Sequence, residues 1–163
     1  FDHPNVLRAV LLDRPGTPSA SRETIVVLEA QLDDVTGESL GYAMERLFAA
    51  GALDVYYTPV MMKKNRPGTL ISALCEYASA DRCESAMLEH TSTFGVRRSV
   101  WSRRILNRRW VTADTPYGPV RVKQGLDGDR LVRQSPEYED AAAAAAAHGV
   151  PLDAVYREAL KRV

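Results

Sequence analysis

The sequence has no excess of charge of either sign. Its 163 residues carry 21 Lys and Arg and 21 Asp and Glu, so the formal net charge at pH 7 is zero. General binding to nucleic acid or to a membrane surface relies on a broad field of one sign. The charge balance argues against both kinds of partner, and any anion-binding site must be local.

Cysteine and histidine are scarce, with two and three residues. Cys75 and Cys83 show no CxxC and no paired Cys/His spacing, so we expect two small buried hydrophobes and no zinc or redox site. His3, His90 and His148 are scattered along the chain. A nickel or zinc site built within this chain alone is therefore not expected.

Long apolar runs are also missing. No run reaches the roughly 18 residues of a membrane span, and no positively charged, apolar-cored leader is present, so we expect a soluble, cytoplasmic protein. The chain begins with Phe1 rather than Met, which suggests a fragment of a longer protein. It has no Gly-rich phosphate loop and no Rossmann fingerprint. A phosphate site must therefore come from side chains and loop amides.

What the sequence does contain is an alternation of strand-like and helix-like segments. Residues 1–22 carry a short apolar piece at 6–12 and then a Pro-, Gly- and Ser-rich stretch that is typical of a linker. The segments after it show period-two or helical spacing of apolar residues. In chain order we expect a strand at 24–32, a helix between its cap Thr36 and its stop Gly51, strands at 52–64 and 69–77, a helix capped by Ser79, and a strand at 96–106.

This order predicts an α+β fold of the split-βαβ, ferredoxin-like kind. It is a four-stranded antiparallel sheet with both helices on one face. Pro59 lies inside the second strand and cannot donate to a ladder, so that strand should be at the edge of the sheet, which is its place in this plan. The other sheet face is left free for a ligand, a second domain or another subunit.

The last third of the chain predicts a smaller subdomain of a β-meander followed by two helices. We expect strands at 109–114, 120–123 and 130–133, a helix that Ser135 and Pro136 open, and a last helix from Pro151. The first of these helices passes through seven alanines, to which we attach no chemistry. The predicted organisation is a linker at 1–22, a ferredoxin-like subdomain at 23–106 and the smaller subdomain at 107–163.

An acidic pair, Asp33 and Asp34, separates the first strand from the first helix. Such residues can simply favour the positive end of a helix dipole. Asp33, however, falls on the same strand face as Glu29 and Gln31, and alternate positions on one face bring oxygen ligands together. Both interpretations stay open, and the second makes this pair a candidate site for a hard divalent cation.

Two basic groups are candidates for phosphate contacts. Lys63, Lys64 and Arg66 surround a predicted hairpin, where cations also serve simply to discourage edge-to-edge pairing. The second group alternates along a strand and so should place arginines on both sides of the sheet, some facing a ligand or an interface. It consists of Arg97, Arg98, Arg103, Arg104, Arg108 and Arg109.

A second acidic cluster, Glu137, Glu139 and Asp140, surrounds Tyr138 in the expected first turn of a helix. Dipole complementation explains these residues without any ligand. The same cluster could accept hydrogen bonds from a base or ribose, or attract a divalent ion. Both interpretations stay open.

Several long motifs resemble the C-terminal domain of the LarC-type nickel-insertion proteins. They are LEAQLDDVTGESLGYAMERLFAAGALDVYYTPVMMKKNRPG at 28–68, TFGVRRS at 93–99, TPYGPVRVK at 115–123, and SPEYED followed by HGVPL. The resemblance implies a nickel chelatase, a lyase that inserts Ni²⁺ as substrate ion into a pyridinium-3,5-bisthiocarboxylic acid mononucleotide. The product would be the nickel-pincer cofactor of lactate racemase.

The resemblance extends to His3, Pro4, Asn5 and Val6, which look like part of the family's interdomain segment. It also implies cofactors and partners. The family uses CTP with a divalent ion, Mn²⁺ or Mg²⁺, and its C-terminal domain is the nucleotide-binding part. Its N-terminal domain, which includes a histidine-rich segment, has no counterpart in this sequence and would be a partner. We expect a homo-oligomer, with no nucleic-acid and no membrane partner.

Carried over by motif, the candidate site residues fall into two groups, and none is assigned a catalytic role. The candidate metal ligands are Asp33 and Asp34. The candidate nucleotide contacts are Lys63, Lys64 and Arg66 for the triphosphate, Thr93, Arg97 and Arg98 for the phosphates or for the phosphate of the pincer nucleotide, and Glu137, Tyr138 and Glu139 for base, ribose or ion. A nucleotide-binding or oligomer-forming module without chemistry of its own is the alternative function.

Overall fold

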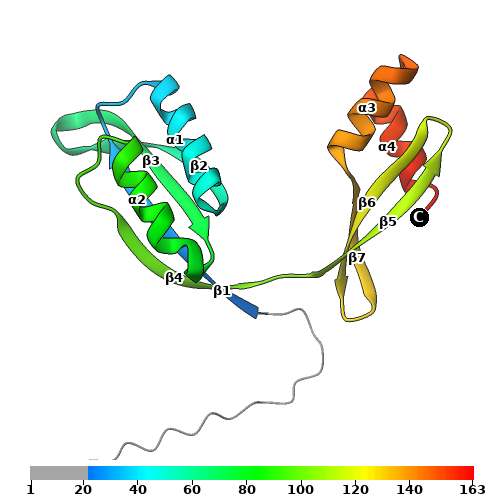
Figure 1. Cartoon of the computed structure of the whole chain (residues 1–163), viewed down its shortest axis with the longest axis horizontal. Coiled ribbons are helices and arrows are strands. Elements are labelled where there is room, and N and C mark those ends of the chain that lie inside the picture. Colours follow the sequence, from blue (N-terminus) through cyan, green and yellow to red (C-terminus); the bar gives the residue numbers. More distant parts are fainter. Residues whose placement is uncertain (1–21) are drawn as a thin grey trace, which may run out of the picture. The chain divides into compact units, whose positions relative to one another are not determined.

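The computed structural model describes residues 22–163, which form two compact units, Arg22–Ile105 and Leu106–Val163 (Figure 1). The linker predicted for residues 1–22 lies outside the described residues, apart from Arg22, which begins the first strand. None of the helices between residues 22 and 163 is both long enough and apolar enough to cross a membrane.

The first unit is a four-stranded antiparallel sheet with two helices, in the spatial order β2-β3-β1-β4. Its helices pack on one face of the sheet (Figure 1). The predicted split-βαβ fold is confirmed. Its elements are β1 (Arg22–Leu32), α1 (Gly37–Ala50), β2 (Ala52–Met62), β3 (Arg66–Cys75), α2 (Ala80–His90) and β4 (Arg97–Arg104), with short 3-10 turns at Lys63–Asn65 and Tyr77–Ser79.

Strand β2 lies at the edge of this sheet, as Pro59 predicted. Pro59 stands opposite Thr69 in a ladder that runs from Ala52 to Met62. Because β2 has a neighbour on one side only, a residue without an N–H can be placed there without breaking a central ladder. The β2–β3 hairpin is also tighter than predicted, since only Lys63–Asn65 separate the two strands.

Helix α1 begins and ends at the predicted residues. The Thr36 hydroxyl accepts the Ser39 N–H at 3.1 Å, which satisfies one of the free amides of the first turn. At the other end Gly51 adopts the left-handed conformation, with φ of 105°, and its N–H donates to the Phe48 carbonyl. Leu47 is completely buried, whereas Phe48 is 46% exposed, so the inward stripe of the helix is narrower than its apolar pattern.

The core of the first unit consists of large aliphatic side chains from the sheet and both helices. Its largest fully buried members include Leu28, Leu32, Leu47, Ile71 and Met87. Two thiols complete this core, and burial raises the pKa of Cys75 to about 11 and also raises that of Cys83. Both cysteines are free and fully buried, so the prediction of two small buried hydrophobes is confirmed.

The second unit is the predicted meander with two helices. Its sheet has the order β5-β6-β7, and its core is made of small residues: Ala113, Val120, Val122, Ala141, Ala145, Val155 and Ala159. Its elements are β5 (Asn107–Thr115), β6 (Gly118–Asp127), β7 (Arg130–Pro136), α3 (Tyr138–His148) and α4 (Leu152–Leu160).

The predicted start of α3 is wrong. Ser135 and Pro136 do not open the helix, because they still pair with Lys123 and Val122 in the β6–β7 ladder. The Glu137 N–H then extends that ladder by donating to the Arg121 carbonyl at 2.8 Å. Pairing with β6 therefore outweighs the local preference for a cap, and α3 begins only at Tyr138.

Candidate nucleotide and metal site

The β2–β3 hairpin presents cations on a strained backbone. Lys64 and Asn65 adopt the left-handed conformation, with φ of 61° and 56°. Asn tolerates this region, whereas a lysine there costs about 1 kcal/mol. Neither Lys63 nor Lys64 forms an ion pair with any residue between 22 and 163. The tip therefore offers two exposed ammonium groups to an external anion.

Asp33 lies beside this hairpin. Its Oδ2 accepts a 3.1 Å hydrogen bond from Arg66 Nη1. This ion pair joins the end of β1 to the start of β3. A cavity of about 210 Å³ opens at this point, lined by Asp33, Gly68, Thr69 and their neighbours. A Cβ on Gly68 would lie 2.7 Å from the Leu32 carbonyl oxygen, so only glycine allows this close approach.

Asp34 faces a different cavity from that of Asp33. It accepts a hydrogen bond from the Ser92 hydroxyl, and it lines a hollow of about 660 Å³ between the start of α1 and the end of α2. His90 lies in the same lining, with its ring edge-to-face on Tyr42 at 5.6 Å between centroids. The adjacent carboxylates of the acidic pair thus line two separate hollows.

The described residues do not supply a complete set of ligands for a divalent ion. Between residues 22 and 163, no three His, Cys, Asp or Glu side chains converge on one point. The expected neighbours of Asp33 on the strand face have other partners, since Glu29 accepts from Ser72 and Gln31 accepts from Arg97. The donor set near Asp33 therefore fits an ion that arrives with phosphate oxygens of its own.

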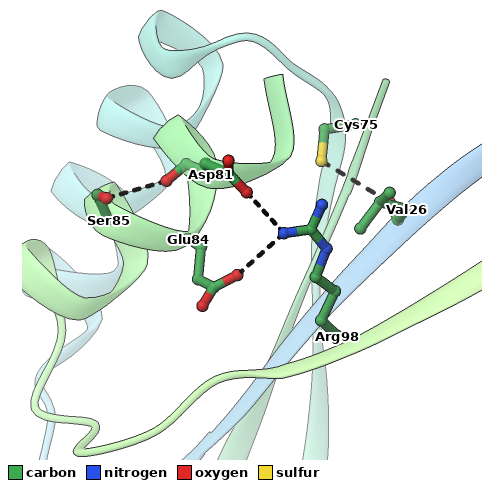
Figure 2. A network of polar contacts seen from close by, with 6 residues as sticks. All are labelled: Val26, Cys75, Asp81, Glu84, Ser85 and Arg98. Atoms are coloured by element: carbon green, nitrogen blue, oxygen red, sulfur yellow. Dashed lines mark hydrogen bonds and ion pairs between the residues drawn. The ribbon is translucent and has the colours of Figure 1, made fainter. Parts of the chain in front are cut away.

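Arg97 and Arg98 point to opposite sides of the sheet, as their alternation predicted. Arg97 lies on the helix-free face, where its Nη1 donates to Gln31 at 3.0 Å and its Nε lies 3.9 Å from a Glu29 oxygen. Arg98 points toward α2 (Figure 2). Arg97 is itself half-exposed and has Glu29 as its one carboxylate partner among the described residues, so an incoming phosphate could share its guanidinium.

The Arg98 guanidinium is already bound on two sides. Its Nη1 lies 2.6 Å from Asp81 Oδ1 and 3.6 Å from Glu84 Oε2 (Figure 2), and its Cζ lies 5.2 Å above the Tyr77 ring. The hydrogen bond to Asp81 raises the pKa of Arg98. These contacts fasten α2 to β4, so a phosphate would have to displace a carboxylate to reach this side chain.

Thr93 lies in the loop between α2 and β4. Its hydroxyl donates to the Gly95 carbonyl at 2.8 Å and also accepts the Gly95 N–H at 3.3 Å. The neighbouring Phe94 is fully exposed. Thr93 therefore shapes the turn that presents Phe94, in addition to any contact with a ligand.

The acidic candidates Glu137 and Glu139, with Tyr138, belong to the second unit, at the start of α3. Tyr138 is 59% exposed, and Glu137 occupies the cap position without a side-chain cap bond. Asp140 instead binds Arg121, with its oxygens 2.8 Å from the Nε and the Nη2 and 3.0 Å from the backbone N. These bonds lower the pKa of Asp140 to about 2, so its carboxylate has a structural task.

The structure adds residues that sequence reasoning missed. Ser92 is one of them, because its bond to Asp34 spans 58 positions and no local pattern signals it. Trp110 is another, with Arg121 and Lys123 near its ring. The signal for this group is the alternation of the RWVT and PVRVK segments, which places one cation opposite the indole once the two strands are paired.

Known proteins similar to the chain point to one family. The family described as "Nickel insertion protein" matches residues 1–156. The chain is 46% identical to the pyridinium-3,5-bisthiocarboxylic acid mononucleotide nickel insertion protein of Geobacillus kaustophilus over 168 aligned positions, which cover 99% of the chain and 41% of that protein. It is 40% identical to the protein of the same description from Lactiplantibacillus plantarum, with 98% and 39% covered.

Solved structures agree with the sequence matches. The C-terminal domain of a cyclometallase involved in the synthesis of the NPN cofactor of lactate racemase, in its apo form, superimposes with a TM-score of 0.82 at 41% identity. The match covers 87% of this chain and 98% of that domain. A protein from Methanopyrus kandleri shares the fold alone, with a TM-score of 0.64 at 23% identity over 85% of the chain and 88% of that protein.

The chain spans about two fifths of the length of the curated relatives that it matches. The family match covers nearly the whole chain, and two relatives of the same description are at least 40% identical over almost all of it. The chain therefore belongs to the nickel insertion protein family.

Proposed function

We propose that the chain is the CTP- and divalent-metal-binding domain of a nickel chelatase. The whole enzyme would insert Ni²⁺ into a pyridinium-3,5-bisthiocarboxylic acid mononucleotide and so form the nickel-pincer cofactor of lactate racemase. The reaction would depend on CTP and place the enzyme among the lyases. The relatives' names and the resemblance in the sequence support the reaction, and the hairpin supports the role of this domain.

One observation carries the proposal. Asp33 lies 3.1 Å from Arg66 at the edge of a small cavity, beside a hairpin that holds Lys63 and Lys64 without carboxylate partners among the described residues. Lysines can bind phosphate oxygens, and a divalent ion can bridge those oxygens to a carboxylate. A charge-assisted hydrogen bond contributes about 1.5–3 kcal/mol and micromolar binding about 8 kcal/mol. Several such contacts plus the ion suffice.

The other candidate residues complete the proposal with different weights. Arg97 and Thr93 would support the phosphates, and the paired Arg98 would act mainly by holding α2 on β4. Asp34 would bind a metal only if its hydrogen bond from Ser92 were exchanged. Glu137, Tyr138 and Glu139 would contact base, ribose or ion.

We further propose that the chain works as a homo-oligomer together with the N-terminal domain found in its family. The helix-free face of the first sheet leaves Trp101 56% and Tyr56 43% exposed, and aromatic side chains of this kind are enriched at protein interfaces. The active assembly would then combine nucleotide binding here with metal insertion elsewhere in the protein.

Calorimetry of the 163-residue chain with CTP, ATP, GTP and UTP, each with Mn²⁺ and with excess chelator, tests the proposal. We expect CTP to bind with the ion and much more weakly without it, because phosphates would otherwise meet the Asp33 carboxylate directly. Equal affinity for CTP in chelator would contradict the metal bridge. Release of phosphate or pyrophosphate by this chain alone would make it catalytic, whereas binding without turnover would assign the chemistry to the N-terminal domain.

A further inference from the structure

The helix-free face of the second sheet carries an exposed indole and several cations. Side chains alternate between the two faces of a strand, and α3 and α4 cover the face that carries Val120 and Val122. The strand register places the remaining side chains together on the opposite face. They are Arg108, Trp110, Thr112, Arg121, Lys123 and Arg133, which we call the Trp110 face.

An exposed indole lies among the cations of this face. Trp110 is 50% exposed, and Lys123 stands directly opposite it on β6. The Lys123 Nζ lies 5.6 Å and the Arg121 Cζ 5.8 Å from the indole centroid, which is within the range of cation–π attraction. The ring is therefore an electron-rich surface that already attracts positive charge.

The cations of the Trp110 face are poorly neutralised. Asp140 binds Arg121, and Asp114 lies exposed at the end of β5 on the same face. Arg108, Lys123 and Arg133 form no ion pair with any residue that the structure describes. Three unpaired cations that share one sheet face with an exposed aromatic ring match a ligand that combines a planar ring with several anionic groups.

We propose that the Trp110 face binds the pyridinium mononucleotide, with its ring on Trp110 and its anionic groups on Arg108, Lys123 and Arg133. The identity of the ligand rests on the proposed function, whereas the surface does not involve the hairpin proposed for CTP. A pyridinium ring is both aromatic and cationic, so it suits the indole better than a neutral base does. Its phosphate and thiocarboxylate groups supply the negative charges that the unpaired cations require.

Fluorescence of the 163-residue chain carrying Trp101→Phe tests this surface, because Trp110 is then the only indole. The probe is nicotinic acid mononucleotide, a pyridinium carboxylate mononucleotide. Uridine 5′-monophosphate has the same phosphate and ribose but a neutral ring, and inorganic phosphate has no ring. We expect saturable quenching by the first, weaker quenching by the second and none by phosphate. Equal binding of the two mononucleotides would overturn the proposal.

Substitutions sharpen the test by calorimetry with the same probe. Trp110→Ala should weaken binding of nicotinic acid mononucleotide about 5- to 150-fold through lost stacking. Lys123→Gln should weaken it about tenfold, because one charged donor is lost. Trp101→Ala is the matched control, since it removes a similarly exposed indole from the first sheet, and it should bind normally. Unchanged affinity in Trp110→Ala would refute the proposal.

Two further measurements separate lost ligand binding from poor folding, and the mononucleotide proposal from the CTP proposal. Trp110→Phe retains an aromatic ring with weaker cation attraction, so it should show intermediate affinity even if the alanine variant folds poorly. CTP titrations of the same variants distinguish the two proposals. If the variants lose mononucleotide binding but bind CTP normally, the Trp110 face is supported. If the parent chain does not bind CTP at all, the loss of mononucleotide binding in the variants still supports the Trp110 face. CTP binding without any mononucleotide binding would overturn the inference alone.

Discussion

The two units have the same layered plan, a sheet with two helices on one face. They differ in whether the cations on the opposite, helix-free face have carboxylate partners. On the first sheet Arg97 lies by Glu29 and Arg103 binds Glu23, so positive charge is matched within the face. On the second sheet, Arg108 and Lys123 share the face with an exposed indole and form no ion pair with any residue between 22 and 163, whereas Arg121 binds Asp140. Matched charges suit contact with another protein surface or with a phosphate that shares a guanidinium, whereas unmatched cations can bind an external anion without sharing it with a carboxylate.

The cores of the two units differ as well. Large aliphatic side chains such as Leu47 fill the first core, whereas the second is made of Ala and Val. Ala141 and Ala145 lie one turn apart on the inner side of α3, and both are buried. The alanine run therefore has a packing role: small side chains let α3 approach the sheet closely. The first core should be sensitive to cavities, and the second to added volume.

The largest expected effect is a cavity in the first core. Leu47→Ala should lower the free energy of unfolding of that unit by about 2–5 kcal/mol, because a fully buried side chain is truncated. Each unit holds one tryptophan, so denaturation followed in Trp101→Phe and Trp110→Phe backgrounds reports the two units separately. The transition of the second unit should not move. A shift of both transitions together would show that the units unfold as one.

The next effect concerns the unpaired cations of the hairpin. Lys64→Ala should weaken CTP binding by about 1.5–3 kcal/mol, roughly ten- to a hundredfold, because a charged donor is lost. Folding stability should hardly change, since the side chain is exposed. Calorimetry and thermal melts measure the two quantities.

Lys64→Gly is the matched variant for the hairpin. It removes the same ammonium but relieves the left-handed strain, so it should bind CTP as weakly as Lys64→Ala while being the more stable of the two. Normal CTP affinity in both variants, and in Lys63→Ala, would assign these lysines to edge protection only.

Added volume in the second core should have a similar or smaller effect. Ala141→Leu should destabilise the second unit by about 1–3 kcal/mol through overpacking against the sheet. Ala143→Leu, on the exposed side of the same helix, should shift stability by no more than about 0.5 kcal/mol. Chemical denaturation followed by Trp110 fluorescence measures both. Equal effects would contradict the close packing of α3.

The smallest effect is a pH dependence within the second unit. The bonds from Arg121 hold the pKa of Asp140 at about 2, below its ordinary value of 3.8. Stability from a depressed carboxylate is fully present above the ordinary pKa and is lost as the pH falls through the folded one. Asp140→Asn should therefore melt lower than the parent above about pH 4, and this difference should shrink toward pH 2.

A control is available for the pH series. Asp153→Asn removes the carboxylate of an exposed pair with Arg157 on α4, and exposed pairs of this kind contribute little. Its melting temperature should follow the parent at every pH. A constant gap between the parent and Asp140→Asn down to pH 2 would contradict the link to Asp140 ionisation.

Much of the fold could be predicted because the signals are local. The caps Thr36 and Gly51 act within one helical turn, and Pro59 restricts its own strand whatever lies around it. The start of α3 could not be predicted, because pairing of Ser135 and Pro136 with β6 outweighed a correct local preference. Local residue preferences therefore predict where a helix begins only if those residues do not pair with a neighbouring strand.

The sequence by itself determined the order of strands and helices, the edge position of β2 and the burial of both cysteines, since periodicity and residue chemistry are properties of neighbours along the chain. Only the tertiary structure decided which charges are matched. Asp33 and Asp34 are adjacent in sequence, yet Asp33 pairs with Arg66 and Asp34 with Ser92, and the two carboxylates line separate hollows. Partner choice depends on strand register across the sheet, and residues dozens of positions apart fix that register jointly.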